Sequence, residues 1–316
     1  MLFLERLRAY AARAVMELIL VALCIALAFC APNFLTAGNM LNILRTISMQ
    51  GLIAFGMTMV IIAGEIDLSV GSAVAFSGCL IALMVESGVS VPLAFFITLA
   101  VGFSIGTFTG FIRARYEVPT FITSLALLTG LRGGARLITG GFPVTPDFPD
   151  WYVFMGSGYV FRTVPFPAIM LLVTFGVVHF LMNYTTFGRS VYAVGGNPGA
   201  ARLCGINVFL VRVLVLAITG TLAALSGVML SGRIMSGDPT VAQGWELDVI
   251  SAVIIGGTSL MGGVGTVWGT LIGLIFIGVI INGMTLLNVP TDVQYVVRGL
   301  LILVAVLINR MQLRKE

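Results

Sequence analysis

The sequence contains few charged residues for its length. Of its 316 residues, 9% are charged and 59% are hydrophobic, whereas soluble domains contain about 25% charged residues. The net charge of +4 would suggest a nucleic-acid partner in a soluble chain, but the basic residues here fit the rule for cytoplasmic membrane ends better. The composition therefore predicts a protein that crosses the lipid bilayer several times and binds no nucleic acid.

Lysine and histidine are almost absent, which excludes several kinds of enzyme. The single lysine is Lys315, so the chain has no Gly-x-x-x-x-Gly-Lys-Ser/Thr phosphate loop and cannot hydrolyse ATP by that route. The single histidine, His179, rules out a histidine-rich metal site and makes a serine triad or a zinc hydrolase a poor interpretation. We expect no enzymatic activity, no metal and no cofactor in this chain.

The four cysteines form no closely spaced pair of the kind that binds metal or exchanges disulfides. Three of them lie within apolar runs, where cysteine behaves as a small hydrophobic residue. We predict free thiols at Cys24, Cys30, Cys79 and Cys204.

Long apolar runs predict an all-α bundle of about ten membrane-spanning helices in a single transmembrane domain over residues 1–316. A span needs about 17 to 25 mainly apolar residues. No small-residue cleavage site follows the first run, so we expect it to be retained and not removed as a signal peptide. The candidate segments are residues 14–32, 46–64, 70–86, 92–112, 119–138, 164–182, 211–231, 249–261, 266–286 and 293–309.

The basic residues orient these segments. Arginine and lysine are enriched at the cytoplasmic ends of membrane helices. When the N-terminus is placed inside, the inner ends collect 11 of the 17 basic residues, and both termini are then cytoplasmic. These 11 are Arg6, Arg8, Arg13, Arg113, Arg115, Arg189, Arg202, Arg212, Arg310, Arg314 and Lys315.

A polar phrase interrupts the apolar runs at residues 64–72, which read GEIDLSVGS. An acid at the bilayer centre costs about 2.5–3.5 kcal/mol on insertion scales, so such acids normally face protein, a water-filled path or an interface. We interpret Glu65, Asp67, Ser69 and Ser72 as residues that line or support a translocation pathway. The alternative is that Asp67 and Ser69 only cap the following helix.

The phrase Glu65-Ile66-Asp67-Leu68 recurs as Glu246-Leu247-Asp248-Val249, and Ser-Ala-Val follows each copy within four residues. The first copy follows the second candidate segment and the second copy follows the seventh. An odd offset between the copies would invert one half of the chain relative to the other, as is common in transporters. The pattern predicts a weak inverted repeat and adds Glu246 and Asp248 to the pathway residues.

Glycine recurs at every fourth position in two stretches. Hydrophobic attraction between helices is weak in lipid, so a smooth glycine face that lets two backbones approach is a common means of association. We therefore expect helix packing at Gly102, Gly106 and Gly110, and again at Gly265, Gly269 and Gly273.

The longest interior loop is predicted at about residues 183–212. Pro198 suits the first turn of a helix, residues 200–203 are good helix formers, and Gly205 can end the helix in a left-handed conformation. We predict a short exposed helix that serves as a docking element. An ordinary basic connector is the alternative.

Three stretches of the sequence resemble the membrane-spanning permeases of bacterial ABC importers for simple sugars, the ribose, arabinose and xylose group. They are residues 64–72, residues 186–207 (TFGRSVYAVGGNPGAARLCGIN) and residues 255–273 (IGGTSLMGGVGTVWGTLIG). Residues 295–299 (YVVRG) add support. The order and spacing of these stretches extend the resemblance over nearly the whole chain.

This resemblance implies an inner-membrane subunit that moves a monosaccharide by alternating access. Its partners would be a second permease copy, a periplasmic sugar-binding protein and a cytoplasmic ABC ATPase that uses the ATP and magnesium. In such permeases a short helix with Glu-Ala-Ala, followed by a glycine, docks on the ATPase. Gly199 stands here in place of the glutamate. The expected coupling residues are Gly196, Asn197, Ala200, Ala201, Arg202 and Gly205.

Two functions of other classes compete with this interpretation. A proton-coupled secondary sugar transporter would use the four carboxylates of the repeated phrase as proton carriers. A membrane scaffold or receptor subunit would tolerate changes such as Asp67→Asn and would transport nothing.

Overall fold

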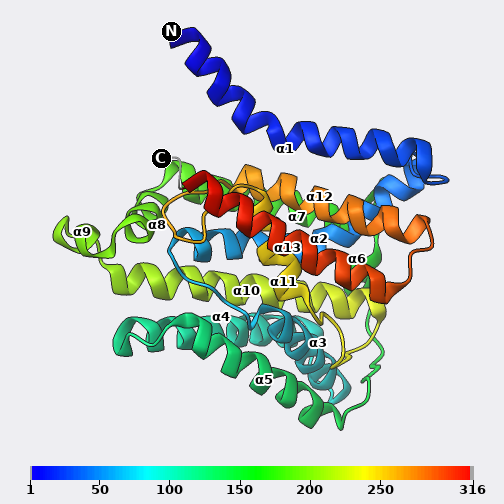
Figure 1. Ribbon diagram of the computed structural model, residues 1–316. Coiled ribbons are helices and arrows are strands. Elements are labelled where there is room, and N and C mark those ends of the chain that lie inside the picture. Colours follow the sequence, from blue (N-terminus) through cyan, green and yellow to red (C-terminus); the bar gives the residue numbers. More distant parts are fainter. Residues whose placement is uncertain (1, 314–316) are drawn as a thin grey trace.

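The structure is a computed structural model that describes residues 2–313. Nearly all of its regular structure is helical (Figure 1). Several basic residues used above for orientation lie outside the part whose side chains are described, namely Arg6, Arg8, Arg13, Arg310, Arg314 and Lys315. The elements in chain order are α1 (Leu2–Cys30), α2 (Ala37–Ile62), α3 (Val70–Glu86), α4 (Val91–Tyr116), α5 (Thr120–Thr139), α6 (Asp150–Ser157), β1 (Tyr159–Val160), β2 (Val164–Pro165), α7 (Phe166–Tyr184), α8 (Thr186–Gly196), α9 (Pro198–Leu203), α10 (Val208–Ile234), α11 (Trp245–Ile255), α12 (Val267–Leu286) and α13 (Thr291–Leu313).

Each of the ten predicted segments overlaps a helix, so the prediction of a helical bundle is confirmed. Among the described residues, six helices are long and apolar enough to cross a membrane, namely α2, α4, α5, α7, α10 and α12. The apolar part of α1 and the whole of α3 are shorter, and the number ten stays a prediction. The short strands β1 and β2 form an antiparallel hairpin that was not predicted, and its turn has left-handed backbone conformations at Phe161 and Arg162.

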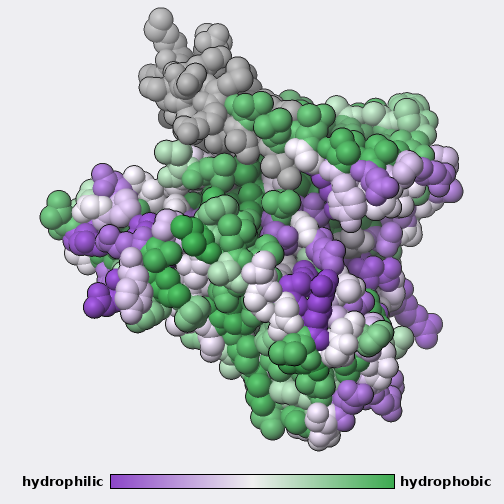
Figure 2. Space-filling model, turned by 60° about the horizontal axis from the view of Figure 1, so that its bottom comes forward, coloured by the Kyte–Doolittle hydropathy of each residue, from purple (hydrophilic) through white to green (hydrophobic). Residues whose placement is uncertain are grey.

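Large hydrophobic side chains cover much of the outside of the bundle. In Figure 2, hydrophobic residues spread across the visible face, while hydrophilic residues gather near its two ends and in a patch between. The exposed side chains include Phe103 and Phe108 of α4, and Phe121 and Ile122 of α5. Extensive apolar surface of this kind marks contact with a membrane or a partner. This agrees with the prediction of a bilayer environment.

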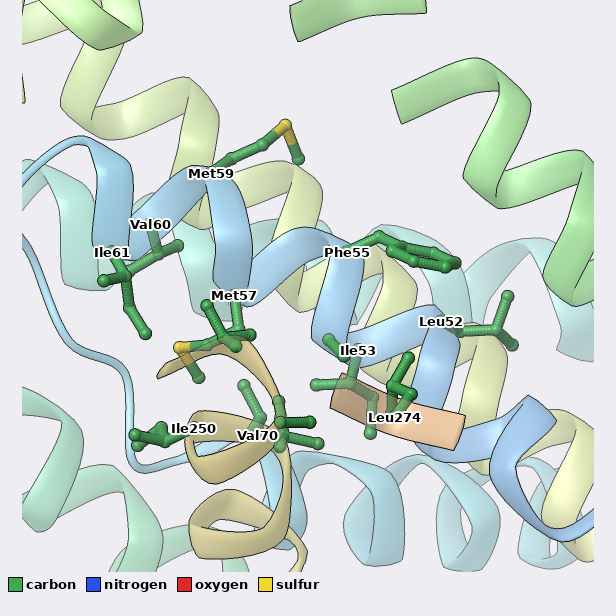
Figure 3. Close-up of a cluster of buried hydrophobic side chains, with 14 of the residues drawn as sticks. Leu52, Ile53, Phe55, Met57, Met59, Val60, Ile61, Val70, Ile250 and Leu274 are labelled. Carbon is green, nitrogen blue, oxygen red and sulfur yellow. The ribbon is translucent and has the colours of Figure 1, made fainter. Parts of the chain in front are cut away.

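Helices α2 and α10 lie at the centre of the bundle. Almost every residue of α2 from Ile47 to Ile62 is buried, and α2 packs against α7, α10, α11 and α12. Helix α10 packs in turn against α2, α3 and α4. In Figure 3, Met57 and Ile53 of α2 point toward Ile250 of α11 and Leu274 of α12. A helix that is apolar on all sides is suited to this central position.

Helices α4 and α10 approach each other at three glycines. Gly102, Gly106 and Gly110 lie on the face of α4 that meets α10. A Cβ atom on Gly110 would lie 2.6 Å from Cα of Val213, and one on Gly106 would overlap the carbonyl group of Leu216. The two backbones are therefore separated by less than the thickness of one side chain.

The second group of glycines is divided between a helix and a loop. Gly269 and Gly273 of α12 face α11, where Cβ atoms on them would overlap main-chain carbonyl oxygens. Gly265 lies before the helix, because Thr266 caps α12 by accepting a hydrogen bond from the Gly269 amide at 2.9 Å. Gly265 is therefore part of the loop between α11 and α12 and not of the helix face.

Replacing Gly106 with leucine is expected to reduce the yield of folded permease about tenfold or more, because overpacking typically costs about 1–3 kcal/mol or more. The added side chain would meet the backbone of α10, which cannot move aside as a flexible side chain can. The measurement is the monodisperse fraction after detergent extraction. Gly130→Leu in α5, where nothing lies within 4 Å of the added Cβ, is the control. Equal yields from the two variants would contradict the prediction.

The first copy of the repeated phrase lies between two helices, and the second copy directly follows such an interruption. Helix α2 ends at Ile62 and α3 begins at Val70, with non-helical chain between them, and α10 ends at Ile234 before α11 begins at Trp245. We call residues 63–69 the first break and residues 235–244 the second break. Irregular backbone at membrane depth occurs only where protein or a water-filled cavity surrounds it. The two breaks are therefore the natural places to look for a functional site.

Candidate functional site

Glu65 connects the first break to three helices. Its buried carboxylate places Oε1 2.7 Å from Nε of Arg113 in α4 and 2.9 Å from Nε of Arg212 in α10. Arg113 donates a hydrogen bond, whereas the Arg212 contact is an ion pair without hydrogen-bond alignment. The hydroxyl of Thr120, at the start of α5, donates to Oε2 at 3.0 Å. Two guanidinium groups thus compensate one carboxylate and hold the break against α4, α5 and α10.

Asp67 is satisfied within its own turn. Its Oδ1 accepts hydrogen bonds from the amide of Ser69 at 2.8 Å and from the hydroxyl of Ser69 at 2.6 Å. The hydroxyl of Ser72 donates to the Ser69 carbonyl at 2.8 Å. All three residues are buried. Short polar side chains commonly bond to nearby backbone in this way. Ser69, the residue before α3, makes no side-chain cap hydrogen bond, so these contacts order the turn before the helix and do not cap it.

The second copy of the phrase lies in the first turn of α11. Asp248 is buried, and its Oδ2 lies 3.1 Å from Nη1 of Arg298 in α13 and 3.3 Å from Nε2 of Gln50 in α2. Glu246 has one buried oxygen, Oε2, without a hydrogen-bond partner. That oxygen lies against Gly71 of α3, where a Cβ atom would overlap it. The first turns of α3 and α11 therefore meet inside the bundle.

The polar cavity beside Asp248 is small. It is lined by Asp248, Ser251 and Arg298 together with apolar residues of α12 and α13. Its volume of about 10 Å³ leaves room for about one water molecule. A monosaccharide does not fit into this cavity.

The predicted interior loop folds mainly into two helices, α8 and α9, which lie at one end of the bundle in Figure 1. The predicted short helix is confirmed as α9, Pro198–Leu203. The side chain of Asn197 accepts a hydrogen bond from the amide of Ala200 at 3.0 Å and so caps the helix. Gly205 has a φ of 82°, the left-handed conformation that was predicted to end it.

Most of the predicted coupling residues are exposed. Gly196, Asn197, Ala200, Arg202 and Gly205 are accessible, whereas Ala201 is buried against the bundle. Beside them, 91% of the Leu203 side chain is exposed. The segment thus presents one basic and one apolar side chain on a capped, firmly attached helix.

Several partners of the carboxylates were not predicted from the sequence. Arg113 and Arg212 were used only to orient the chain, and Thr120, Arg298 and Gln50 were given no role. A usable signal was nevertheless present, because a buried charge requires a compensating partner. The arginines near the ends of the apolar segments were the available candidates.

Comparison with known proteins gives a consistent result. A sequence model of the family described as "Branched-chain amino acid transport system / permease component" matches residues 39–306. The ribose import permease of Bacillus subtilis is 42% identical over 280 residues, which cover 88% of this chain and 87% of that protein. No solved structure matches significantly.

Relatives with other named sugars match over the same extent. A xylose transport system permease of Haemophilus influenzae is 36% identical, with coverage of 89% of this chain and 91% of that protein. An L-arabinose ABC transporter permease of Azospirillum brasilense is 37% identical, with coverage of 88% and 82%.

Proposed function

The chain belongs to this family of membrane permease components of transport systems, and on that premise we propose that it is the membrane subunit of an ATP-driven importer for a monosaccharide. The observation that carries the proposal is the identity of 36–42% to permeases named for ribose, xylose and arabinose, over nearly nine-tenths of the chain.

The substrate class is a sugar and not an amino acid. The description of the family refers to branched-chain amino acids, whereas the similar full-length relatives above are named for pentoses. Sequence identity at this level over most of the chain is the more specific guide to the substrate, because one family model matches permeases for many substrates.

A cytoplasmic ABC ATPase drives the transport by docking on α9. Three features support this assignment. The helix is exposed, it follows the family pattern at Ala200, Ala201 and Gly205, and Arg202 and Leu203 project from it. A periplasmic sugar-binding protein delivers the solute on the opposite side. Both termini then lie in the cytoplasm of a bacterial cell with this chain in the inner membrane.

The translocation pathway lies between two copies of the chain. The small size of the polar cavity within one copy supports this arrangement. The helices around each break also follow a common order, α2–α3–α4–α5 around the first and α10–α11–α12–α13 around the second. The first helix of each series packs on the third helix of the other series: α10 packs on α4, and α2 packs on α12. This reciprocal packing supports an inverted repeat. The half-helices of the repeat, α3 and α11, move during alternating access.

A proton-coupled transporter is disfavoured by the partners of the carboxylates. Glu65 and Asp248 are paired with arginines, and a guanidinium group does not release its proton in proteins. These two carboxylates therefore serve better as structural ties than as members of a proton relay. A scaffold without transport activity would have no use for the capped and exposed α9.

Reconstitution tests the proposal. Proteoliposomes that contain the permease, the ATPase and the binding protein encoded with it should take up radiolabelled D-ribose, D-xylose or L-arabinose only when ATP is present. Leucine serves as the amino-acid control. Uptake by the permease alone, or uptake that a protonophore abolishes while ATP is held constant, would overturn the proposal.

Replacing Arg202 with glutamate is expected to weaken ATPase binding about fivefold to tenfold. An exposed charge pair is worth about 0.2–1 kcal/mol, and a charge reversal adds repulsion. Affinity is measured by pull-down of the ATPase with detergent-purified permease at low salt. Arg136→Glu, at an exposed arginine near the other end of the bundle, should bind normally. If both variants bind as wild type does, α9 is not the docking site.

A further inference from the structure

Three chain segments meet at glycines next to the docking helix. They are the end of α2 with Gly64, the end of α8 with Gly195 and Gly196, and the loop between α11 and α12 with Gly262 and Gly263. We call these five residues the glycine junction. At this junction main chain meets main chain, as it does between α4 and α10, but here three segments are involved.

The approach at the junction leaves no room for a side chain at Gly195, Gly262 or Gly263. A Cβ atom on Gly195 would overlap the carbonyl oxygen of Ile62 and lie 2.6 Å from the amide nitrogen of Gly263. A Cβ atom on Gly262 would lie 2.8 Å from the Gly195 oxygen and 3.0 Å from Cα of Gly64. Gly64, Gly262 and Gly263 also have φ angles of 79°, 83° and 74°, which favour glycine.

Hydrogen bonds fix the segments to one another. The amide of Gly263 donates to the carbonyl oxygen of Ile62 at 2.8 Å. The hydroxyl of Tyr192 in α8 donates to the carbonyl oxygen of Gly265 at 2.9 Å. The loop between α11 and α12 is therefore bonded both to the end of α2 and to α8.

The junction lies between the docking helix and both breaks. On one side, α8 continues through Asn197 into α9. On the other side, Gly64 is the second residue of the first break, next to the ion pairs of Glu65. The loop with Gly262 and Gly263 directly follows α11, whose first turn holds Glu246 against Gly71. The glycine junction is thus directly connected through the chain to the first break, which leads to α3, and to the end of α11.

We infer that the glycine junction transmits the motion of the ATPase from α9 to the two broken helices, so that Gly195 and Tyr192 are positioning residues for transport. The inference rests on the proposed function and adds the residues inside the permease that receive the motion. Displacement of α8 would pull the end of α2 and the end of α11 together, and would therefore move α3 and α11 in one step.

The test compares Gly195→Ala with Gly176→Ala in reconstituted complexes. Both substitutions raise helix propensity, but nothing lies within 4 Å of a Cβ atom on Gly176. A mixture of radiolabelled D-ribose, D-xylose and L-arabinose is the probe, and ATP hydrolysis and ATPase binding are measured in the same samples. We expect complexes with Gly195→Ala to bind the ATPase and hydrolyse ATP, while sugar uptake per ATP hydrolysed falls at least tenfold. The Gly176→Ala control should behave like the wild type.

Unchanged uptake by Gly195→Ala would overturn the inference, and so would loss of ATPase binding in parallel with uptake, because that result would make the junction part of the docking surface. If Gly195→Ala does not fold, Tyr192→Phe decides. It removes one hydrogen bond and should lower uptake per ATP about threefold, and full coupling in that variant would refute the role. Wild-type permease that binds no ATPase would instead refute the proposed function.

Discussion

Replacing Glu65 with glutamine is expected to destabilise the permease by about 3–5 kcal/mol, the usual cost of removing one partner from a buried ion pair. Glutamine keeps the volume and can still accept a hydrogen bond from Thr120. The guanidinium groups of Arg113 and Arg212, with side chains only 21% and 13% exposed, would face each other without a compensating charge. The measurement is the midpoint of thermal unfolding of the detergent-purified permease, which should fall clearly.

Glu86→Gln provides the matched control, because this acid lies exposed at the end of α3. Its midpoint should equal that of the wild type. A double variant, Glu65→Gln with Arg113→Gln, should lose less stability than the two single variants added together, since it removes one of the unpaired charges. A normal unfolding midpoint for Glu65→Gln would mean that the contacts of Glu65 with Arg113, Arg212 and Thr120 do not hold the first break in place.

Replacing Gly71 with alanine is expected to reduce uptake about tenfold or more, because overpacking typically costs about 1–3 kcal/mol. The new Cβ atom would overlap the carboxylate of Glu246 and lie 2.7 Å from the carbonyl oxygen of Ala242. The carboxylate can rotate away, but the carbonyl belongs to the backbone of the second break. The substitution therefore pushes α3 and α11 apart where their first turns meet. Uptake into proteoliposomes is the measurement.

The control for Gly71→Ala is Gly133→Ala in α5, where a Cβ atom meets nothing within 4 Å. Adding Glu246→Ala to the Gly71→Ala variant should restore uptake only in part, because the contact with the Ala242 carbonyl remains. Normal uptake by Gly71→Ala alone would show that the meeting of the two breaks is not required for transport.

Helix positions followed well from the sequence because hydrophobicity changes sharply at their ends. The segment predicted at residues 70–86 matches α3 at both ends, since polar residues precede it and Glu86 ends it. The segment predicted at 249–261 was displaced relative to α11, Trp245–Ile255. The acids at its start were excluded from the apolar window, although acids are favourable in the first turn of a helix.

The contacts of the candidate site were predicted less well from the sequence, because they join residues that lie far apart in it. Glu65 lies 48 positions from Arg113, and Asp248 lies 198 positions from Gln50. Helix α8 was also missed, since its three glycines favoured a loop over a helix. Two of these glycines are explained by packing, because a Cβ atom on Gly188 or on Gly195 would overlap a neighbouring carbonyl oxygen. Helix propensity alone does not reveal such packing contacts.

The glycine junction has a practical consequence for mutagenesis. Alanine scanning tests a residue by truncating its side chain, and glycine has none to truncate. A survey that skips glycines, or that reads alanine as a neutral replacement, would pass over the contact next to the docking helix. Here the informative perturbation is the addition of a single methyl group.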